Sequence, residues 1–93
     1  MKVNVRFHSR FKHVFGDGEQ QIELDSGSTI RDLLTCLCVT DVHSKTLYAE
    51  KDQRLRHDVL VTKNGRFVFH MKRLDTELEE GDRVAILYPA CMG

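Results

Sequence analysis

The sequence predicts an α+β domain in which a mixed five-stranded sheet carries one main helix on one face. Three observations lead to this class: two alternating segments near the N-terminus, one amphipathic helical segment, and three apolar strand segments toward the C-terminus. The expected order along the chain is β-β-α-β-β-β. One helix covers one face of such a sheet, so the other face is expected to stay open.

Size and charge narrow the class of protein. The chain has 93 residues, which suits one domain with a modest core. Lys and Arg number 14 and Asp and Glu number 14, so the basic excess typical of nucleic-acid or anionic-membrane binding is missing. No apolar run approaches the roughly 20 residues of a membrane span, and the N-terminus alternates instead of forming a signal peptide. We expect a cytoplasmic protein with no nucleic-acid or membrane partner.

The first two strands are predicted from alternation. Residues 2–7 place Val3, Val5 and Phe7 on one face. Residues 19–24 alternate again, with Ile22 and Leu24 facing inward. The segment between them reads as a long loop that ends in a glycine turn, so the two strands should form a hairpin.

The main helix is predicted from its cap and its spacing. Thr29 is a favourable N-cap, and Asp32 stands three residues later to complete a capping box. The residues that follow form one apolar stripe at helical spacing: Ile30, Leu33, Leu34 and Leu37. Residues 39–58 are polar and weakly patterned, and we expect only a short helix there, around Ser44 to Glu50.

The C-terminal half predicts three strands. Asn64-Gly65 is a two-residue hairpin turn between an apolar segment that starts at Val59 and the segment Phe67-Val68-Phe69. Residues 74–78 should form a turn or one helical turn. After a tight turn at Glu80-Gly81-Asp82, residues 83–87 form the last strand, and Pro89 ends it.

Both faces of these last strands are apolar, which predicts a partner surface. One set should fill the core: Val59, Val61, Phe67, Phe69, Val84 and Ile86. The other set should form a patch on the open face: Leu60, Val68, Ala85 and Leu87. The alternative is that residues 39–58 fold over this patch and hide it.

The chain is expected to divide into a domain over residues 1–87 and a flexible tail over residues 88–93. The tail consists of Tyr88, Pro89, Ala90, Cys91, Met92 and Gly93. Extended, it reaches roughly 20 Å beyond the sheet. A terminal glycine leaves its carboxyl group unhindered. The simpler interpretation is a frayed terminus that ends in glycine by chance.

Four segments carry a resemblance to a known family. They are the alternating segment 2–7, the helix start Thr29-Ile30-Arg31-Asp32-Leu33-Leu34, the block Val59 to Phe67 with Lys63-Asn64-Gly65-Arg66, and the ending Leu78-Glu79-Glu80-Gly81-Asp82-Arg83-Val84-Ala85-Ile86-Leu87-Tyr88-Pro89. In this order and at this length, the chain resembles the ThiS/MoaD sulfur carriers and the related ubiquitin-like and small archaeal modifiers. The resemblance implies a ubiquitin-like β-grasp fold.

The resemblance also implies a function for the tail. Family members are carrier substrates, not enzymes, so Gly93 would be the reacting residue and an ATP-dependent, ubiquitin-activating-like enzyme would adenylate it. Conversion to a thiocarboxylate would then supply sulfur for molybdopterin or tungstopterin, thiamin or tRNA thiolation, with a pterin synthase large subunit or another sulfur acceptor as a further partner. ATP would be used by the partner enzyme, and this chain would bind no cofactor. The partner-binding residues would be Leu60, Val68, Ala85, Leu87, Tyr88, Pro89, Ala90, Cys91 and Met92.

Two other functions stay open. A modifier relative would be conjugated to lysines through Gly93. A β-grasp interaction module would use the open face alone, and Met92 supports that view because the family usually ends in Gly-Gly. Methionine is bulkier than glycine and disfavours positive φ, so the partner is adapted to it or activation is weakened or lost. Cys91 is a candidate acyl or sulfur acceptor, although an incidental residue is the simpler interpretation.

The remaining chemistry-bearing residues form no recognisable site. Cys36 and Cys38 are two residues apart and point to different sides of the predicted helix, so we predict no metal there and place them in the core or at its boundary. The histidines are scattered: His8, His13, His43, His57 and His70. Acidic residues over 75–82 are interpreted as a solvated turn that could also steer a basic partner.

Overall fold

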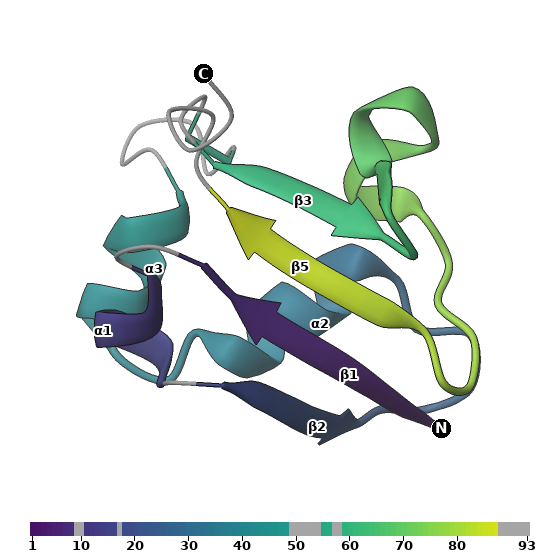
Figure 1. Ribbon diagram of the computed structural model, residues 1–93, viewed down its shortest axis with the longest axis horizontal. Helices are drawn as coiled ribbons and strands as arrows, with labels where there is room; N and C mark the ends of the chain where they lie inside the picture. Colours follow the sequence, from purple (N-terminus) through teal and green to yellow (C-terminus); the bar gives the residue numbers. More distant parts are fainter. Residues whose placement is uncertain (9–10, 17, 49–54, 57–58, 88–93) are drawn as a thin grey trace.

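The computed structural model describes the chain except for residues 9–10, 17, 49–54, 57–58 and 88–93, and this part contains a five-stranded sheet with helices packed against it (Figure 1). The strands lie in the order β2-β1-β5-β3-β4. The central pair, β1 and β5, is parallel, and the other neighbouring pairs are antiparallel. The predicted α+β class with a mixed five-stranded sheet is confirmed.

The N-terminal hairpin consists of β1 (Lys2–Phe7) and β2 (Glu19–Glu23). The three inward residues of β1 are fully buried, as their alternation predicts. The expected loop between the strands instead contains a short helix, α1 (Phe11–Phe15). Phe11 is fully buried, and the Phe15 ring stacks on Phe7 with centroids 4.9 Å apart. Tertiary contacts therefore stabilise a helix that is too short to show a sequence period.

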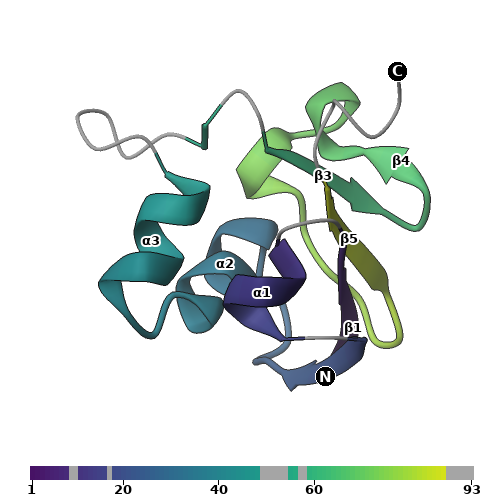
Figure 2. The same ribbon diagram turned by 60° about the vertical axis from the view of Figure 1, so that its left-hand side comes forward.

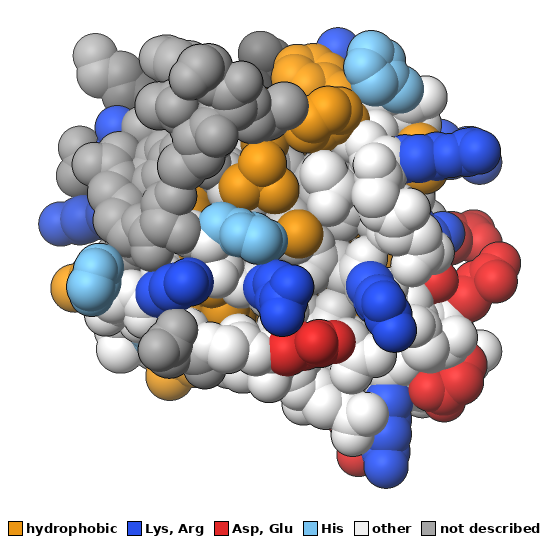
Figure 3. All heavy atoms as spheres, in the orientation of Figure 1, with side chains coloured by type: hydrophobic (Ala, Val, Ile, Leu, Met, Phe, Trp, Pro, Cys, Tyr) orange, Lys and Arg blue, Asp and Glu red, His pale blue; other side chains and the backbone are white. Residues whose placement is uncertain are grey.

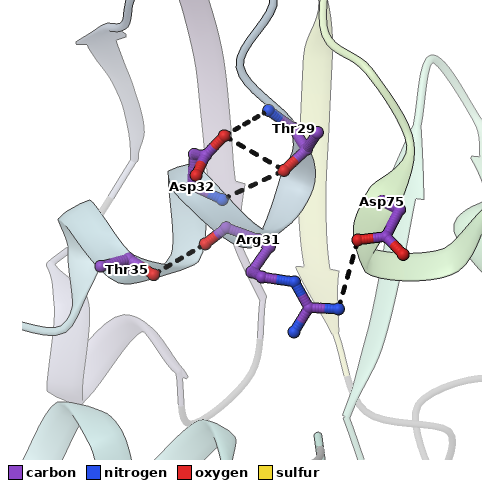
Figure 4. A network of polar contacts seen from close by, with 5 residues as sticks. All are labelled: Thr29, Arg31, Asp32, Thr35 and Asp75. Atoms are coloured by element: carbon purple, nitrogen blue, oxygen red, sulfur yellow. Dashed lines mark hydrogen bonds and ion pairs between the residues drawn. The ribbon is translucent and has the colours of Figure 1, made fainter.

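The main helix, α2 (Ile30–Leu37), begins where its cap predicts. The Thr29 N–H donates to Asp32 Oδ2 at 2.9 Å, and the Asp32 N–H donates to Thr29 Oγ1 at 3.4 Å (Figure 4). These two bonds satisfy N–H groups that the first helical turn leaves free. The predicted apolar stripe is buried, and Arg31 reaches Asp75 at 3.3 Å on the neighbouring segment.

A second helix, α3 (Asp41–Leu47), begins three residues before the predicted start at Ser44. Thr40 caps it, and its third residue, His43, connects it to α1. His43 Nδ1 accepts a hydrogen bond from the Val39 N–H at 3.2 Å, and its ring stacks on Phe15 with centroids 4.8 Å apart. α3 therefore lies with α1 and α2 in one helical layer (Figure 2). In this arrangement, the part of residues 39–58 that the structure describes does not fold over the open face of the sheet.

The second hairpin contains β3 (Leu60–Lys63) and β4 (Arg66–Phe67). Asn64 and Gly65 turn the chain with φ angles of 52° and 85°, so the predicted positive-φ turn is confirmed. β4 ends after two residues, and the chain continues in two 3₁₀ turns, η1 (Val68–His70) and η2 (Arg73–Asp75). β5 (Arg83–Leu87) follows a turn in which Gly81 has a φ of 82°.

The core lies between the sheet and the helical layer. Its buried apolar residues come from both layers: Val3, Val5, Phe7, Phe11, Leu24, Ile30, Leu33, Leu34, Leu37, Leu47, Val59, Val61, Val68, Leu78, Val84 and Ile86. Among the described residues, no helix has both the length and the apolar character that crossing a bilayer requires. The opposite face of the sheet carries no helix in the described part of the chain (Figures 1 and 2).

Candidate partner surface at the end of the last strand

The last strand, β5, has side chains on both the core face and the open face of the sheet. It lies between β1 and β3, so both of its edges are paired. Val84 and Ile86 point into the core, at 1% and 0% exposure. Ala85 and Leu87 alternate with them and are half-buried on the open face. The described part of the chain therefore ends at the C-terminal end of a central strand.

The register brings apolar side chains together beside that end. Leu60 of β3 lies opposite Leu87, and Ala85 lies opposite Thr62. Thr62 also lies opposite Phe67 of β4, which places Phe67 on the same face. We define the open-face patch as Leu60, Phe67, Ala85 and Leu87. In Figure 3, apolar side chains gather over β3 and the end of β5.

Three of the predicted partner-binding residues thus share one surface, and Val68 does not. Its side chain is only 5% exposed and belongs to the core, so assigning it to the open face is wrong. The reason is the register of the β3–β4 hairpin: Phe67 lies opposite Thr62 on the open face, so the next residue, Val68, points to the core. The same register keeps Phe67, which is half-buried, out of the core, and Phe69, in the 3₁₀ turn that follows β4, is 60% exposed.

The predicted tail residues fall outside the described part of the chain. They are Tyr88, Pro89, Ala90, Cys91, Met92 and Gly93. Their assigned roles, including that of Gly93 as the reacting residue, remain predictions. The boundary between the domain over residues 1–87 and a tail over 88–93 likewise remains a prediction.

Charged side chains occupy the other half of the open face. The hairpin register places Lys2 opposite Glu23 and Arg6 opposite Glu19. Opposite charges at directly paired positions favour the hairpin and balance each other locally. In Figure 3, basic and acidic side chains lie over the β1 and β2 side of this face, away from the apolar side chains over β3. The open face therefore has an apolar half and a charged, polar half.

The acidic stretch over residues 75–82 lies at the far end of β5 from Leu87. It precedes Arg83, the first residue of the strand, so the strand's length of roughly 13 Å separates its last residue from Leu87. Asp82 within it is 7% exposed. Burial raises the pKa of Asp82, but hydrogen bonds from Asn64 and the Glu79 N–H, with the charge of Lys63, outweigh burial and hold it below its usual value. Asp82 is therefore a structural carboxylate at the opposite end of β5 from Leu87.

The described cysteines differ in their surroundings. Cys36 is exposed, contrary to the predicted core or boundary position, whereas Cys38 is half-buried against the core. Burial raises the pKa of the Cys38 thiol, and a hydrogen bond with Ser44 only partly opposes this effect. A raised pKa keeps the group as a weakly nucleophilic thiol. Within the described residues, His, Cys, Asp and Glu form no group that could hold a metal ion.

This sheet order, with a parallel central pair and a main helix against one face, defines a ubiquitin-like β-grasp protein. The model of the ThiS family matches residues 5–91. The chain therefore belongs to the ThiS family of small ubiquitin-like sulfur carriers and modifiers.

Three similar proteins illustrate the relationship. Small archaeal modifier protein 3 of Haloferax volcanii is 29% identical over 93 residues, which cover 100% of both chains. A solved structure from Pyrococcus furiosus, assigned as molybdopterin converting factor, subunit 1, is 33% identical with a TM-score of 0.73 and covers 95% of this chain and 97% of that one. Small archaeal modifier protein 1 of H. volcanii shares the fold, with 19% identity, a TM-score of 0.80, and coverage of 95% and 97%.

Proposed function

We propose that this chain is a sulfur carrier whose Gly93 carboxylate is activated by a separate, ubiquitin-activating-like enzyme. The observation that carries the proposal is that β5 ends at Leu87, which is itself part of the open-face patch. The six residues that follow thus start at the margin of an apolar surface that a partner can cover. Membership of the ThiS family supports the same function.

The chemistry needs a good leaving group on an otherwise unreactive carboxylate. In the first step, an oxygen of the Gly93 carboxylate attacks the α-phosphorus of ATP, and pyrophosphate leaves. In the second step, hydrosulfide from a sulfur donor attacks the acyl carbon, AMP leaves, and one proton is released. The product is a thiocarboxylate. The enzyme supplies ATP and the catalytic groups, and this chain supplies the acyl group and the docking surface.

The relatives favour two uses of the activated glycine. The P. furiosus relative, assigned as molybdopterin converting factor, supports delivery of sulfur to a pterin, with a synthase large subunit as the second partner. The H. volcanii relative, named as a modifier, supports transfer of the acyl group to a lysine Nζ with loss of AMP, which forms an isopeptide bond. We favour the carrier function and keep the modifier function as the second candidate.

One experiment separates these outcomes. The purified protein is incubated with a ubiquitin-activating-like enzyme, ATP and sulfide, and ATP–pyrophosphate exchange and the intact mass are measured. We expect exchange and replacement of one oxygen by sulfur at Gly93, and neither in a variant that lacks Gly93. Exchange followed only by branched peptides at lysines would identify a modifier. No exchange with any such enzyme from the same organism would contradict both functions.

A further inference from the structure

Phe69 is an exposed aromatic residue whose position the fold itself does not explain. The β3–β4 register places Phe67 on the open face and Val68 in the core, and Phe69 lies in the 3₁₀ turn that follows, where it is 60% exposed. The described residues contain three exposed large apolar side chains, and Phe69 is the aromatic one. Solvent exposure of a phenylalanine forgoes the stabilisation that its burial gives. Exposed aromatic residues of this kind are frequent anchors in protein interfaces.

Three exposed basic residues lie within four positions of Phe69 in the sequence, and one of them contacts its ring. Arg66, Lys72 and Arg73 are exposed, and the Arg73 guanidinium lies over the Phe69 ring, 5.1 Å from its centroid. Within the described part of the chain, Arg66 and Lys72 form no ion pair, so their charges are available to a partner. We define the basic aromatic shoulder as Arg66, Phe69, His70, Lys72 and Arg73. It concentrates positive charge in a chain with no net charge.

Arg73 also has a costly backbone conformation. Its φ of 55° lies in the left-handed region, which non-glycine residues adopt only at an energetic cost. This conformation accompanies the placement of the guanidinium over Phe69. Backbone strain of this type persists where surrounding contacts hold it, and it is concentrated at functional sites.

The shoulder is continuous with the open-face patch. Phe67 belongs to the patch, and its ring meets the His70 ring edge to face, with centroids 6.4 Å apart. A surface of about 800 Å², typical of one side of a stable interface, is large enough to include both regions. One partner can therefore contact Leu87, Phe67 and Phe69 at the same time.

We propose that the basic aromatic shoulder selects the activating enzyme, by docking an acidic surface of that enzyme that has an apolar pocket for Phe69. The inference rests on the proposed function, because it assigns the shoulder to the same partner. Positive charge around an aromatic anchor complements a carboxylate-rich rim around an apolar pocket. The charges accelerate association and reject basic surfaces, and Phe69 slows dissociation. In this proposal, any activating enzyme contacts the open-face patch and the tail, whereas the shoulder determines which of these enzymes binds.

The test uses the full chain and the enzyme that gives ATP–pyrophosphate exchange with the unmodified protein. The shoulder variant Lys72→Glu/Arg73→Glu is compared with Lys12→Glu/Lys45→Glu, which makes the same charge change at exposed positions of the helical layer. Phe69→Ala is compared with Val42→Ala, since Val42 is 61% exposed on α3. Association and dissociation rates are measured at low and high salt, and thermal unfolding verifies that each variant is folded.

We expect the shoulder charge reversal to slow association about tenfold or more at low salt, with a smaller difference at high salt. Phe69→Ala should weaken binding about tenfold, mainly through faster dissociation. Both controls should stay within about twofold of the unmodified protein.

Shoulder variants that match their controls, while the unmodified protein still supports exchange, would overturn the shoulder's role and leave the proposed function standing. Absence of exchange with the unmodified protein would overturn the proposed function and this inference with it. Tight binding of a single-stranded RNA oligonucleotide that the shoulder variants lose would also overturn the inference, because it would assign the shoulder to nucleic acid.

Discussion

Asn64 bridges two turns through Asp82. Its Nδ2 donates to Asp82 Oδ1 at 3.0 Å, and its Oδ1 accepts from the Arg83 N–H at 3.0 Å. The other oxygen of Asp82 accepts from the Glu79 N–H at 2.8 Å and lies 3.4 Å from Lys63 Nζ. The β3–β4 turn is thereby joined to the start of β5, the strand that leads toward the tail.

Replacing this carboxylate should destabilise the fold. Asp82→Ala leaves the Asn64 and Glu79 donors without their acceptor in a largely buried site, so we expect the free energy of unfolding to fall by about 2 kcal/mol. Urea denaturation measures this change. Asp75→Ala is the control, because its ion pair with Arg31 joins side chains that are 73% and 53% exposed and should contribute ~0.5 kcal/mol or less. Equal losses in the two variants would contradict the bridging role.

The same carboxylate should make stability depend on acid pH. The pKa of Asp82 is lower in the folded protein than its ordinary value of 3.8. Its contribution is therefore complete above the unfolded-state pKa and is lost as pH falls through the lower, folded-state pKa. We expect the stability difference between the unmodified protein and Asp82→Asn to shrink between about pH 5 and about pH 2, as measured by urea unfolding. A difference that stays constant over this range would refute the assignment.

Replacement by valine should change the stability of the protein in opposite directions at two threonines. Thr76 is 6% exposed, and its Oγ1 has no hydrogen-bond partner among the described residues. Thr76→Val removes this unsatisfied hydroxyl and should stabilise the protein by about 1 kcal/mol. Thr29→Val removes the N-cap of α2 and should destabilise it by about 1 kcal/mol. Thermal and urea unfolding of the pair compare the two effects, and destabilisation by Thr76→Val would show that its hydroxyl is satisfied.

The open-face patch should affect activation more than stability. Leu60→Asp places a charge among half-buried apolar side chains, and we expect the Michaelis constant of the activating enzyme for the carrier to rise about tenfold or more. Gln21→Asp adds the same charge at an exposed position on β2, in the polar half of that face, and should have little effect. Steady-state ATP–pyrophosphate exchange provides the measurement. Equal effects of the two variants would rule out a specific role for the patch.

Substitution of the penultimate residue, Met92, should show whether the activating enzyme is adapted to methionine at this position. If the proposed function is correct, the cognate enzyme accepts Met92, so Met92→Gly should not accelerate exchange with that enzyme. An enzyme that serves a carrier ending in Gly-Gly should instead act faster on Met92→Gly, because glycine fits a narrow channel and tolerates positive φ. Exchange rates with the two enzymes test this. Strong acceleration by the cognate enzyme would show that Met92 impairs activation.

Local features of the sequence predicted several parts of the fold correctly. Thr29 and Asp32 mark the start of α2 because the capping bonds lie within one helical turn. Asn64-Gly65 marks its hairpin because few residues adopt positive φ. The alternation of β1 likewise identified its buried side. Each of these signals depends on interactions between residues that are close in the chain.

Other features depend on contacts between distant parts of the chain. The short helix α1 is stabilised by Phe11 and Phe15 packing against the core, and five residues are too few to show a helical period. The burial of Val68 follows from the β3–β4 register, which places Phe67 opposite Thr62 on the open face and so points Val68 to the core. Pairing between β3 and β5 decided which apolar residues share the open face. The sequence by itself thus determined the class of fold and the turns, whereas packing and strand register decided the composition of the surface, because they join residues that no local pattern relates.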